Sequence, residues 1–112
     1  MLNRAVSDGV LERDFVVACQ ASLHTTLEAA KAWSSTDFRK DLASIDLPVQ
    51  VIHGTEDATV PIDLSARQAV KILKHPTLVE YEGEAHGLFV TASDRLNEEL
   101  LELAGPRSSA SR

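Results

Sequence analysis

Two short loops in this chain carry an acid and an imidazole at matching positions. Asp57 lies five residues after Ile52, which ends a β-branched run, and His86 lies five residues after a second strand-like run. In open α/β sheets, functional groups gather beyond the carboxyl ends of the strands. If the two strands are parallel neighbours, Asp57 can hold Nδ1 of His86 and stabilise the cation that forms when Nε2 takes a proton. The spacing therefore indicates a pair suited to proton transfer.

Each of these residues also has a purely structural interpretation. An Asp after a strand is often a helix cap or a turn former, and a His in a glycine-containing loop is often only solvated. Glu56 is a competing carboxylate in the same loop, and we expect His53 to be structural, holding that loop through its ring. The four His residues match no zinc spacing such as H-E-x-x-H, so we expect no metal site.

A strand–helix–strand–helix pattern over residues 47–105 positions the two loops. Strands are expected at 49–52 and 77–81, because both runs are rich in β-branched residues. Pro61 and Asp63 open the intervening helix, with Asp63 as its N-cap. Strands joined by such a crossover are parallel, so both loops open at one edge of the sheet.

Helices are expected in the rest of the chain. An apolar stripe that includes Phe15 and Cys19 predicts a helix at 7–21, with Cys19 as a small core residue. Further helices are expected at 24–33, as one turn at 38–42, and after a capping box at 91–94. The chain then divides into a helical segment at 1–46, a strand–helix core at 47–105 and a disordered tail at 106–112.

Two parallel strands form too small a sheet to stand alone. Parallel sheets need several strands and helices on both faces. We therefore expect the chain to pair with more sheet than it contains, either because the remainder was lost by truncation or because another chain supplies it.

Composition argues against several classes of partner. The formal net charge of −6 disfavours nucleic acid and anionic membranes. No apolar run approaches the roughly 20 residues of a membrane span, and the first residues do not read as a secretory signal. The single cysteine, Cys19, cannot form an internal disulfide, and we expect a cytoplasmic protein.

The loops resemble those of a known family. Residues 51–61 resemble the acid-bearing loop of α/β-hydrolases, H-G-x-x-D-x-x-V-P, and residues 81–91 are similar to their histidine loop. Within that family the chain resembles the cofactor-free (non-haem) haloperoxidase, or chloroperoxidase, and aryl esterase group. Its members read H-G-L/F-x-V-T and then L-N-x-x-L-L, here residues 96–101, and residues 36–42 also match the group. The resemblance covers residues 8–103.

This resemblance implies the C-terminal part of an α/β-hydrolase fold with an incomplete sheet. It assigns Asp57 rather than Glu56 as the acid of a Ser-His-Asp triad and His86 as the general base. The chain order Ser…Asp…His also fits that fold. No G-x-S-x-G motif occurs here, so we expect the nucleophile to be absent from this chain and the chain alone to be inactive.

The implied activity is that of an esterase or perhydrolase. Its substrate would be a small ester or a peracid-forming carboxylic acid, and the group needs no cofactor. The helices at 1–46 would derive from the cap over the active site, and Trp33 and Phe89 are candidates for substrate contact as well as for packing. The alternative is a non-catalytic module that completes the sheet of another chain.

Overall fold

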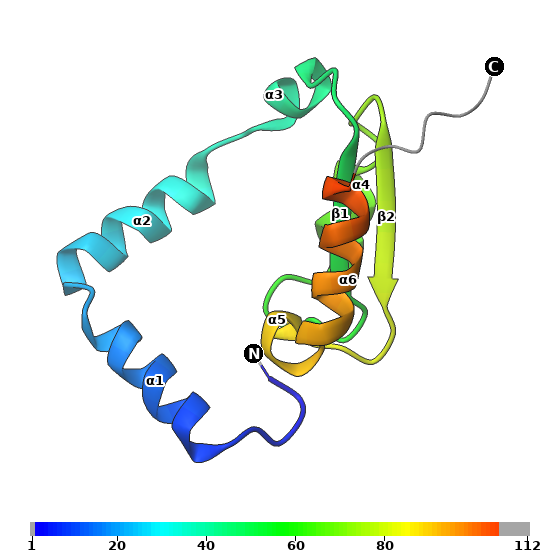
Figure 1. Ribbon diagram of the computed structural model, residues 1–112. Helices are drawn as coiled ribbons and strands as arrows, with labels where there is room; N and C mark the ends of the chain where they lie inside the picture. The colour runs from blue at the N-terminus through cyan, green and yellow to red at the C-terminus, as the bar shows by residue number, and fades with distance from the viewer. Residues whose placement is uncertain (1, 106–112) are drawn as a thin grey trace.

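The computed structural model describes residues 2–105, which form a small α/β core and a helical arm, α1 and α2, that stands away from it (Figure 1). The tail expected at 106–112 lies outside the described residues. The elements in chain order are α1 (Asp8–Cys19), α2 (Leu23–Ser35), α3 (Arg39–Ser44), β1 (Val49–Gly54), the 3₁₀ helix η1 (Ile62–Leu64), α4 (Ala66–Ala69), β2 (Pro76–Tyr81), α5 (Leu88–Thr91) and α6 (Ser93–Ala104).

The strands β1 and β2 pair in parallel, as the strand–helix–strand pattern predicts. Gly54 lies opposite Tyr81 in the register, so both strands end at the same level. Helix α6 covers one face of this sheet, where Gln50 donates to Glu99. On the other face, Arg67 of α4 reaches Glu80 with two hydrogen bonds. The sheet is therefore covered on both faces, and the loops after its strands share one edge.

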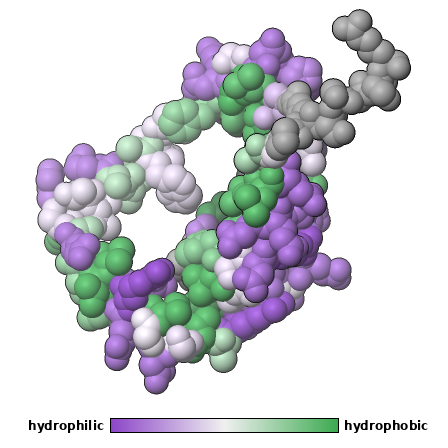
Figure 2. All heavy atoms as spheres, viewed as in Figure 1, coloured by the Kyte–Doolittle hydropathy of each residue, from purple (hydrophilic) through white to green (hydrophobic). Residues whose placement is uncertain are grey.

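The described chain is open rather than compact. Its accessible surface is 8592 Å², whereas a compact protein of 12.2 kDa exposes about 6,100 Å². Its radius of gyration is 16.8 Å, against about 13 Å for a compact domain of this length. Neither α1 nor α2 contains a buried residue. Figure 2 shows the opening between arm and core with all atoms drawn, and apolar atoms on both sides of it.

The arm differs from the sequence-based expectation that its apolar side chains are buried. The sequence predicts packing roles for Phe15, Cys19 and Trp33, but the structure leaves all three exposed. The helices themselves form where the periodicity predicts them, and the Ser22 side chain caps α2 by accepting from the Thr25 N–H. The apolar stripes are thus present, but no described part of the chain covers them.

Two helix starts also differ from expectation. The predicted helix after Pro61 is broken at Ser65, whose φ and ψ of −129° and −91° separate η1 from α4. Asp63 caps neither element and instead pairs with Arg67 at 2.8 Å. The predicted capping box at 91–94 does not form, because the Thr91 hydroxyl donates to Glu84.

Candidate active site

Asp57 lies in the loop after β1 and is buried, with 6% of its surface exposed. Its Oδ1 accepts the backbone N–H groups of Thr59 at 2.9 Å and Val60 at 2.8 Å, which closes a tight turn. Its Oδ2 is 2.8 Å from Nδ1 of His86. The side chain is therefore both a turn former and the partner of the imidazole.

The electrostatics of Asp57 favour its ionised form. Burial raises the pKa of this carboxyl, but the hydrogen bonds from Val60, His86 and Thr59 and the charge of the imidazole together outweigh burial and hold the pKa below its usual value. An ionised carboxylate only accepts hydrogen bonds, so Nδ1 of His86 must carry the hydrogen.

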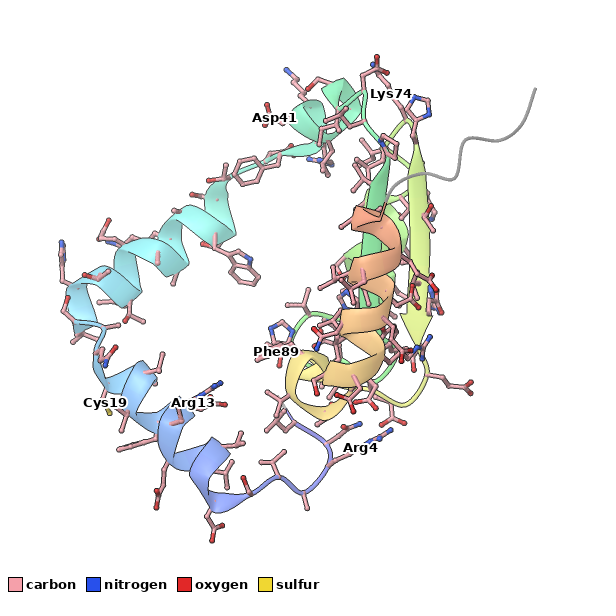
Figure 3. All side chains as sticks on the ribbon, in the orientation of Figure 1. Arg4, Arg13, Cys19, Asp41, Lys74 and Phe89 are labelled. Carbon is pink, nitrogen blue, oxygen red and sulfur yellow. The ribbon has the colours of Figure 1, made fainter. Side chains whose placement is uncertain are left out.

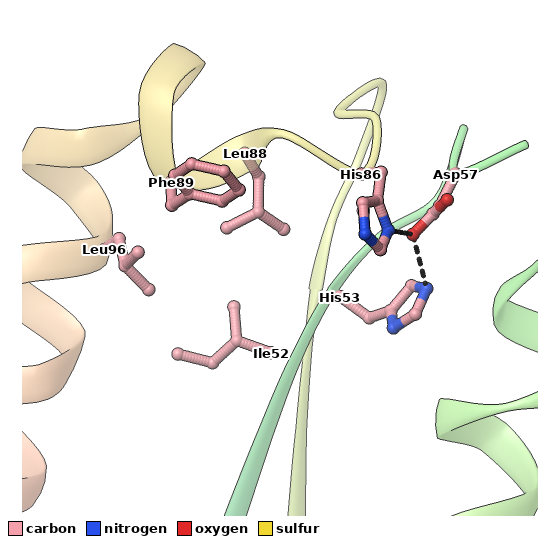
Figure 4. A pocket seen from close by; sticks show the side chains of 8 residues that line it. Ile52, His53, Asp57, His86, Leu88, Phe89 and Leu96 are labelled. Atoms are coloured by element: carbon pink, nitrogen blue, oxygen red, sulfur yellow. Dashed lines mark hydrogen bonds and ion pairs between the residues drawn. The ribbon is translucent and has the colours of Figure 1, made fainter. Parts of the chain in front are cut away.

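Nε2 of His86 is then free to take a proton when the imidazole is neutral. Figure 4 shows this second nitrogen on the side of the ring away from Asp57. The His86 side chain is 38% exposed and faces a pocket of about 380 Å³. Asp57 holds Nδ1 of the ring, and Nε2 lies on the opposite side, which is the arrangement that a general base needs.

His53 supports the same carboxylate from the other side. Its Nε2 lies 2.9 Å from the carbonyl oxygen of Val60 and 3.2 Å from Oδ2 of Asp57. Both are acceptors, so Nε2 of His53 carries a hydrogen. The contact with Val60 agrees with the predicted structural role of this ring. The contact with Asp57 could not be read from the sequence.

Main-chain hydrogen bonds fasten the two loops to each other. The N–H of Thr55 donates to Tyr81 at 3.0 Å, and the N–H of Glu56 donates to the carbonyl of Glu84 at 2.9 Å. The Thr55 hydroxyl accepts the N–H of Gly83 at 2.9 Å. Gly83 has φ +74°, a conformation that favours glycine, so the turn after β2 depends on it.

The pocket beside His86 is mostly apolar. Phe89, one of the two predicted contact residues, lines it, whereas Trp33 lies on α2, is 74% exposed and does not. The other apolar lining residues are Ile52, Leu88 and Leu96, none of which was predicted as a pocket residue. Ile52 could have been identified from its place at the end of the first strand. Glu56, the competing carboxylate, accepts from Asn3 and makes no hydrogen bond to His86.

Residues 2–105 contain neither a metal-binding cluster nor a membrane-spanning helix. No group of three or more His, Cys, Asp and Glu side chains there is arranged to hold a metal ion. Within the same range, no helix has the length and apolar character needed to cross a membrane.

Comparison with known proteins adds to this geometry. The chain is 38% identical over 96 residues to a non-heme haloperoxidase of Rhodococcus erythropolis, which covers 86% of this chain and 35% of that protein. It is 36% identical over 70 residues to a bifunctional esterase/perhydrolase of Acinetobacter calcoaceticus, which covers 62% of this chain and 25% of that protein. A crystal structure of a bromoperoxidase from Bacillus anthracis superposes with a TM-score of 0.83 at 35% identity, over 88% of this chain and 36% of that one.

These matches and the parallel sheet decide the fold. The chain has the fold of the C-terminal part of an α/β-hydrolase. No protein-family model matches it. It spans about a third of the length of several curated relatives that it matches.

The positions of the Asp57 and His86 loops agree with the α/β-hydrolase fold. In that fold, acid and base follow strands at the carboxyl edge of the sheet and the serine precedes both along the chain. Asp57 and His86 occupy two such loops here, in that order. Their roles as acid and base remain predictions.

Proposed function

We propose that this chain supplies the acid and the base of a Ser-His-Asp triad, Asp57 and His86, to an ester-hydrolysing or perhydrolysing α/β-hydrolase. The observation that carries the proposal is the 2.8 Å hydrogen bond between Oδ2 of buried Asp57 and Nδ1 of His86. It leaves Nε2 beside an apolar pocket. The names of the relatives, haloperoxidase and esterase/perhydrolase, support the class of substrate.

In the proposed reaction, a serine hydroxyl outside this chain attacks the carbonyl carbon of an ester while Nε2 of His86 takes the hydroxyl proton. Two backbone N–H groups near that serine stabilise the oxyanion. The bond to the alcohol oxygen breaks as His86 returns the proton to it. Water, activated by the same nitrogen, then attacks the acyl-serine and releases the acid; hydrogen peroxide in its place releases a peracid.

The partner that carries the serine would pair with the free edge of β1. The N–H groups of Val49 and Thr55 donate to the segment that contains β2. Main-chain groups alternate along a strand, so Gln50 and Ile52 present theirs to the other edge. The described chain also leaves large apolar side chains exposed on α1 and α2, among them Phe15, Leu23 and Trp33, which a partner would cover.

Complementation tests the proposal. The chain would be mixed with a polypeptide holding the part of the Rhodococcus relative that it does not match, and hydrolysis of p-nitrophenyl acetate followed. We expect activity only in the mixture, falling on the order of 10³-fold or more with His86→Ala or Asp57→Asn. His24→Ala, an exposed position on α2, is the matched control and should change nothing. Activity of the mixture that survives His86→Ala contradicts the triad, and activity of the chain alone that is lost with His86→Ala contradicts the need for a partner.

The same free surface favours a second candidate, a non-catalytic module that completes another chain's sheet. The two candidates differ in what docking produces. A mixture that forms a stable 1:1 complex with no hydrolysis supports the second candidate. A monodisperse chain that unfolds cooperatively as a monomer and binds nothing argues against it.

A further inference from the structure

A buried carboxylate lies two residues before His86 and takes no part in the proposed reaction. Glu84 is 5% exposed. Its Oε1 is 2.7 Å from the guanidinium of Arg4, and its Oε2 accepts the hydroxyl of Thr91 at 2.5 Å. A buried carboxylate is costly unless it is paired and hydrogen-bonded, and both of these oxygens are. The pairing joins the N-terminal segment, the histidine loop and the end of α5.

The neighbouring residue extends this contact to the acid loop. The Asn3 amide donates to Oε2 of Glu56 at 2.9 Å and to the carbonyl of Gly83 at 2.7 Å. Glu56 precedes Asp57, and its N–H donates to the carbonyl of Glu84. Residues 3–4, which we call the N-terminal strap, thus contact both loops, 53 and 80 positions along the chain. Figure 3 shows Arg4 beside the loop that follows β2.

The geometry points to Arg4 and Glu84 as positioning residues that hold the loop of His86 so that its Nδ1 stays on Asp57. This inference rests on the proposed function, since it concerns the same imidazole. Without the Arg4 guanidinium, the buried Glu84 carboxylate keeps only the Thr91 hydroxyl as a side-chain partner. Burial of a carboxylate that has lost its cation is unfavourable, so we expect the side chain to turn toward solvent. That movement would carry along His86, two residues away, and the Asp57 hydrogen bond would no longer select one tautomer of the ring.

A second ion pair of this chain provides the structural control. Arg67 binds Glu80 through two hydrogen bonds of 2.9 and 2.7 Å, as close as the pair of Arg4 and Glu84. It lies on the α4 face of the sheet and has no hydrogen bond to the histidine loop. If an ion pair only stabilises the fold, replacing either arginine should have the same effect on His86.

The test is the tautomer of His86, read from the imidazole ¹⁵N shifts of the 112-residue chain at a pH where the ring is neutral. The His86 signals are the ones that disappear in His86→Ala. We expect Arg4→Gln and Glu84→Gln to raise the ratio of the Nε2–H to the Nδ1–H tautomer about threefold or more, as the loss of one hydrogen bond would. Arg4→Lys should restore part of the wild-type ratio, while Arg67→Gln and the exposed Glu82→Gln should leave it unchanged.

Urea midpoints separate positioning from stability. The inference is overturned if Arg4→Gln lowers the midpoint as Arg67→Gln does and leaves the tautomer ratio at its wild-type value. Arg4 is 55% exposed at its side chain, so its variants carry the test if Glu84→Gln does not fold. In the complemented enzyme, Arg4→Gln should lower kcat about tenfold with KM within about twofold. An inactive wild-type mixture contradicts the proposed function alone, because the tautomer ratio still decides the role of Arg4.

Discussion

Gly54 is the position where one methyl group would separate the two loops. It ends β1, and a Cβ added there would lie 2.2 Å from the carbonyl oxygen of Glu84, 2.6 Å from its carbon and 2.8 Å from the carbonyl oxygen of Ala85. All three atoms are backbone, so no side chain can turn away to make room. To reach an ordinary contact of 3.4 Å, the histidine loop must move by about 1.2 Å, the difference between 3.4 and 2.2 Å.

A movement of that size should lower both the stability of the chain and the activity of the complemented enzyme. The carbonyl of Glu84 accepts the N–H of Glu56 at 2.9 Å, and moving it by about 1.2 Å breaks that bond. Overpacking costs about 1–3 kcal/mol and the lost hydrogen bond about 1 kcal/mol. We therefore expect Gly54→Ala to lower the free energy of unfolding by about 2–4 kcal/mol. In the complemented enzyme, a shift of this order at His86 should lower kcat about 10²-fold.

Urea unfolding followed by circular dichroism measures the stability term. Gly9→Ala is the matched control, because Gly9 lies in α1 with nothing within 4 Å of the added methyl group. Alanine is the better helix former, so this variant should be as stable as wild type or up to about 1 kcal/mol more stable. A Gly54→Ala chain within about 0.5 kcal/mol of wild type, with the His86 tautomer unchanged, would refute the reasoning.

The remaining predictions concern buried polar groups. The folded state lowers the pKa of Asp57, so its stabilisation is present above the usual carboxyl pKa and is lost as pH falls through the lower folded value. Asp57→Asn should accordingly reduce the difference in unfolding free energy between about pH 6 and pH 3. The Tyr81 hydroxyl is buried without a hydrogen-bond partner in residues 2–105, so Tyr81→Phe should stabilise the chain by about 1 kcal/mol in urea unfolding. Arg67→Gln should destabilise it, because it leaves Glu80 and Asp63 without their cation; an unchanged midpoint would show that this pair contributes nothing.

The sequence predicts the parts of the site that follow from periodicity and spacing. The β-branched runs place two strands, the crossover makes them parallel, and equal offsets bring Asp57 and His86 to one edge. The structure places the two side chains in hydrogen-bond contact. These features are local or fixed by topology, which explains why pattern reasoning reaches them.

The supporting contacts could not be predicted in this way. A Glu in a loop reads as solvated, and the partner that buries Glu84 lies 80 positions earlier, at Arg4. Thr91 fits a capping box as a sequence, but the tertiary contact with Glu84 takes its hydroxyl instead. In both cases a side-chain contact outside the local motif overrides the local preference, and a single sequence contains no signal of that contact.

The apolar stripe of α1 and α2 was predicted correctly as a pattern but not as a buried surface. Its periodicity predicts a buried face, and the helices form with that face uncovered, as Phe15 at 71% and Trp33 at 74% exposure show. The apolar pattern of α1 and α2 therefore indicates that these helices are suited to pack against another surface. The described residues do not provide that surface. Under the proposed function, the polypeptide that carries the serine would also cover this stripe.

The hydrogen-bonded pair of Asp57 and His86 does not depend on that cover. The hydrogen bonds that orient Asp57 and His86 come from this chain, among them the turn at Thr59 and Val60, the ring of His53, and the main-chain bonds between the two loops. Preorganised groups contribute most to catalysis because they need no reorganisation when charge develops. Under the proposed function, association would therefore bring only the serine and the oxyanion donors to a pair that already has its working geometry. The tautomer of His86 should accordingly be the same in the free chain and in the complex.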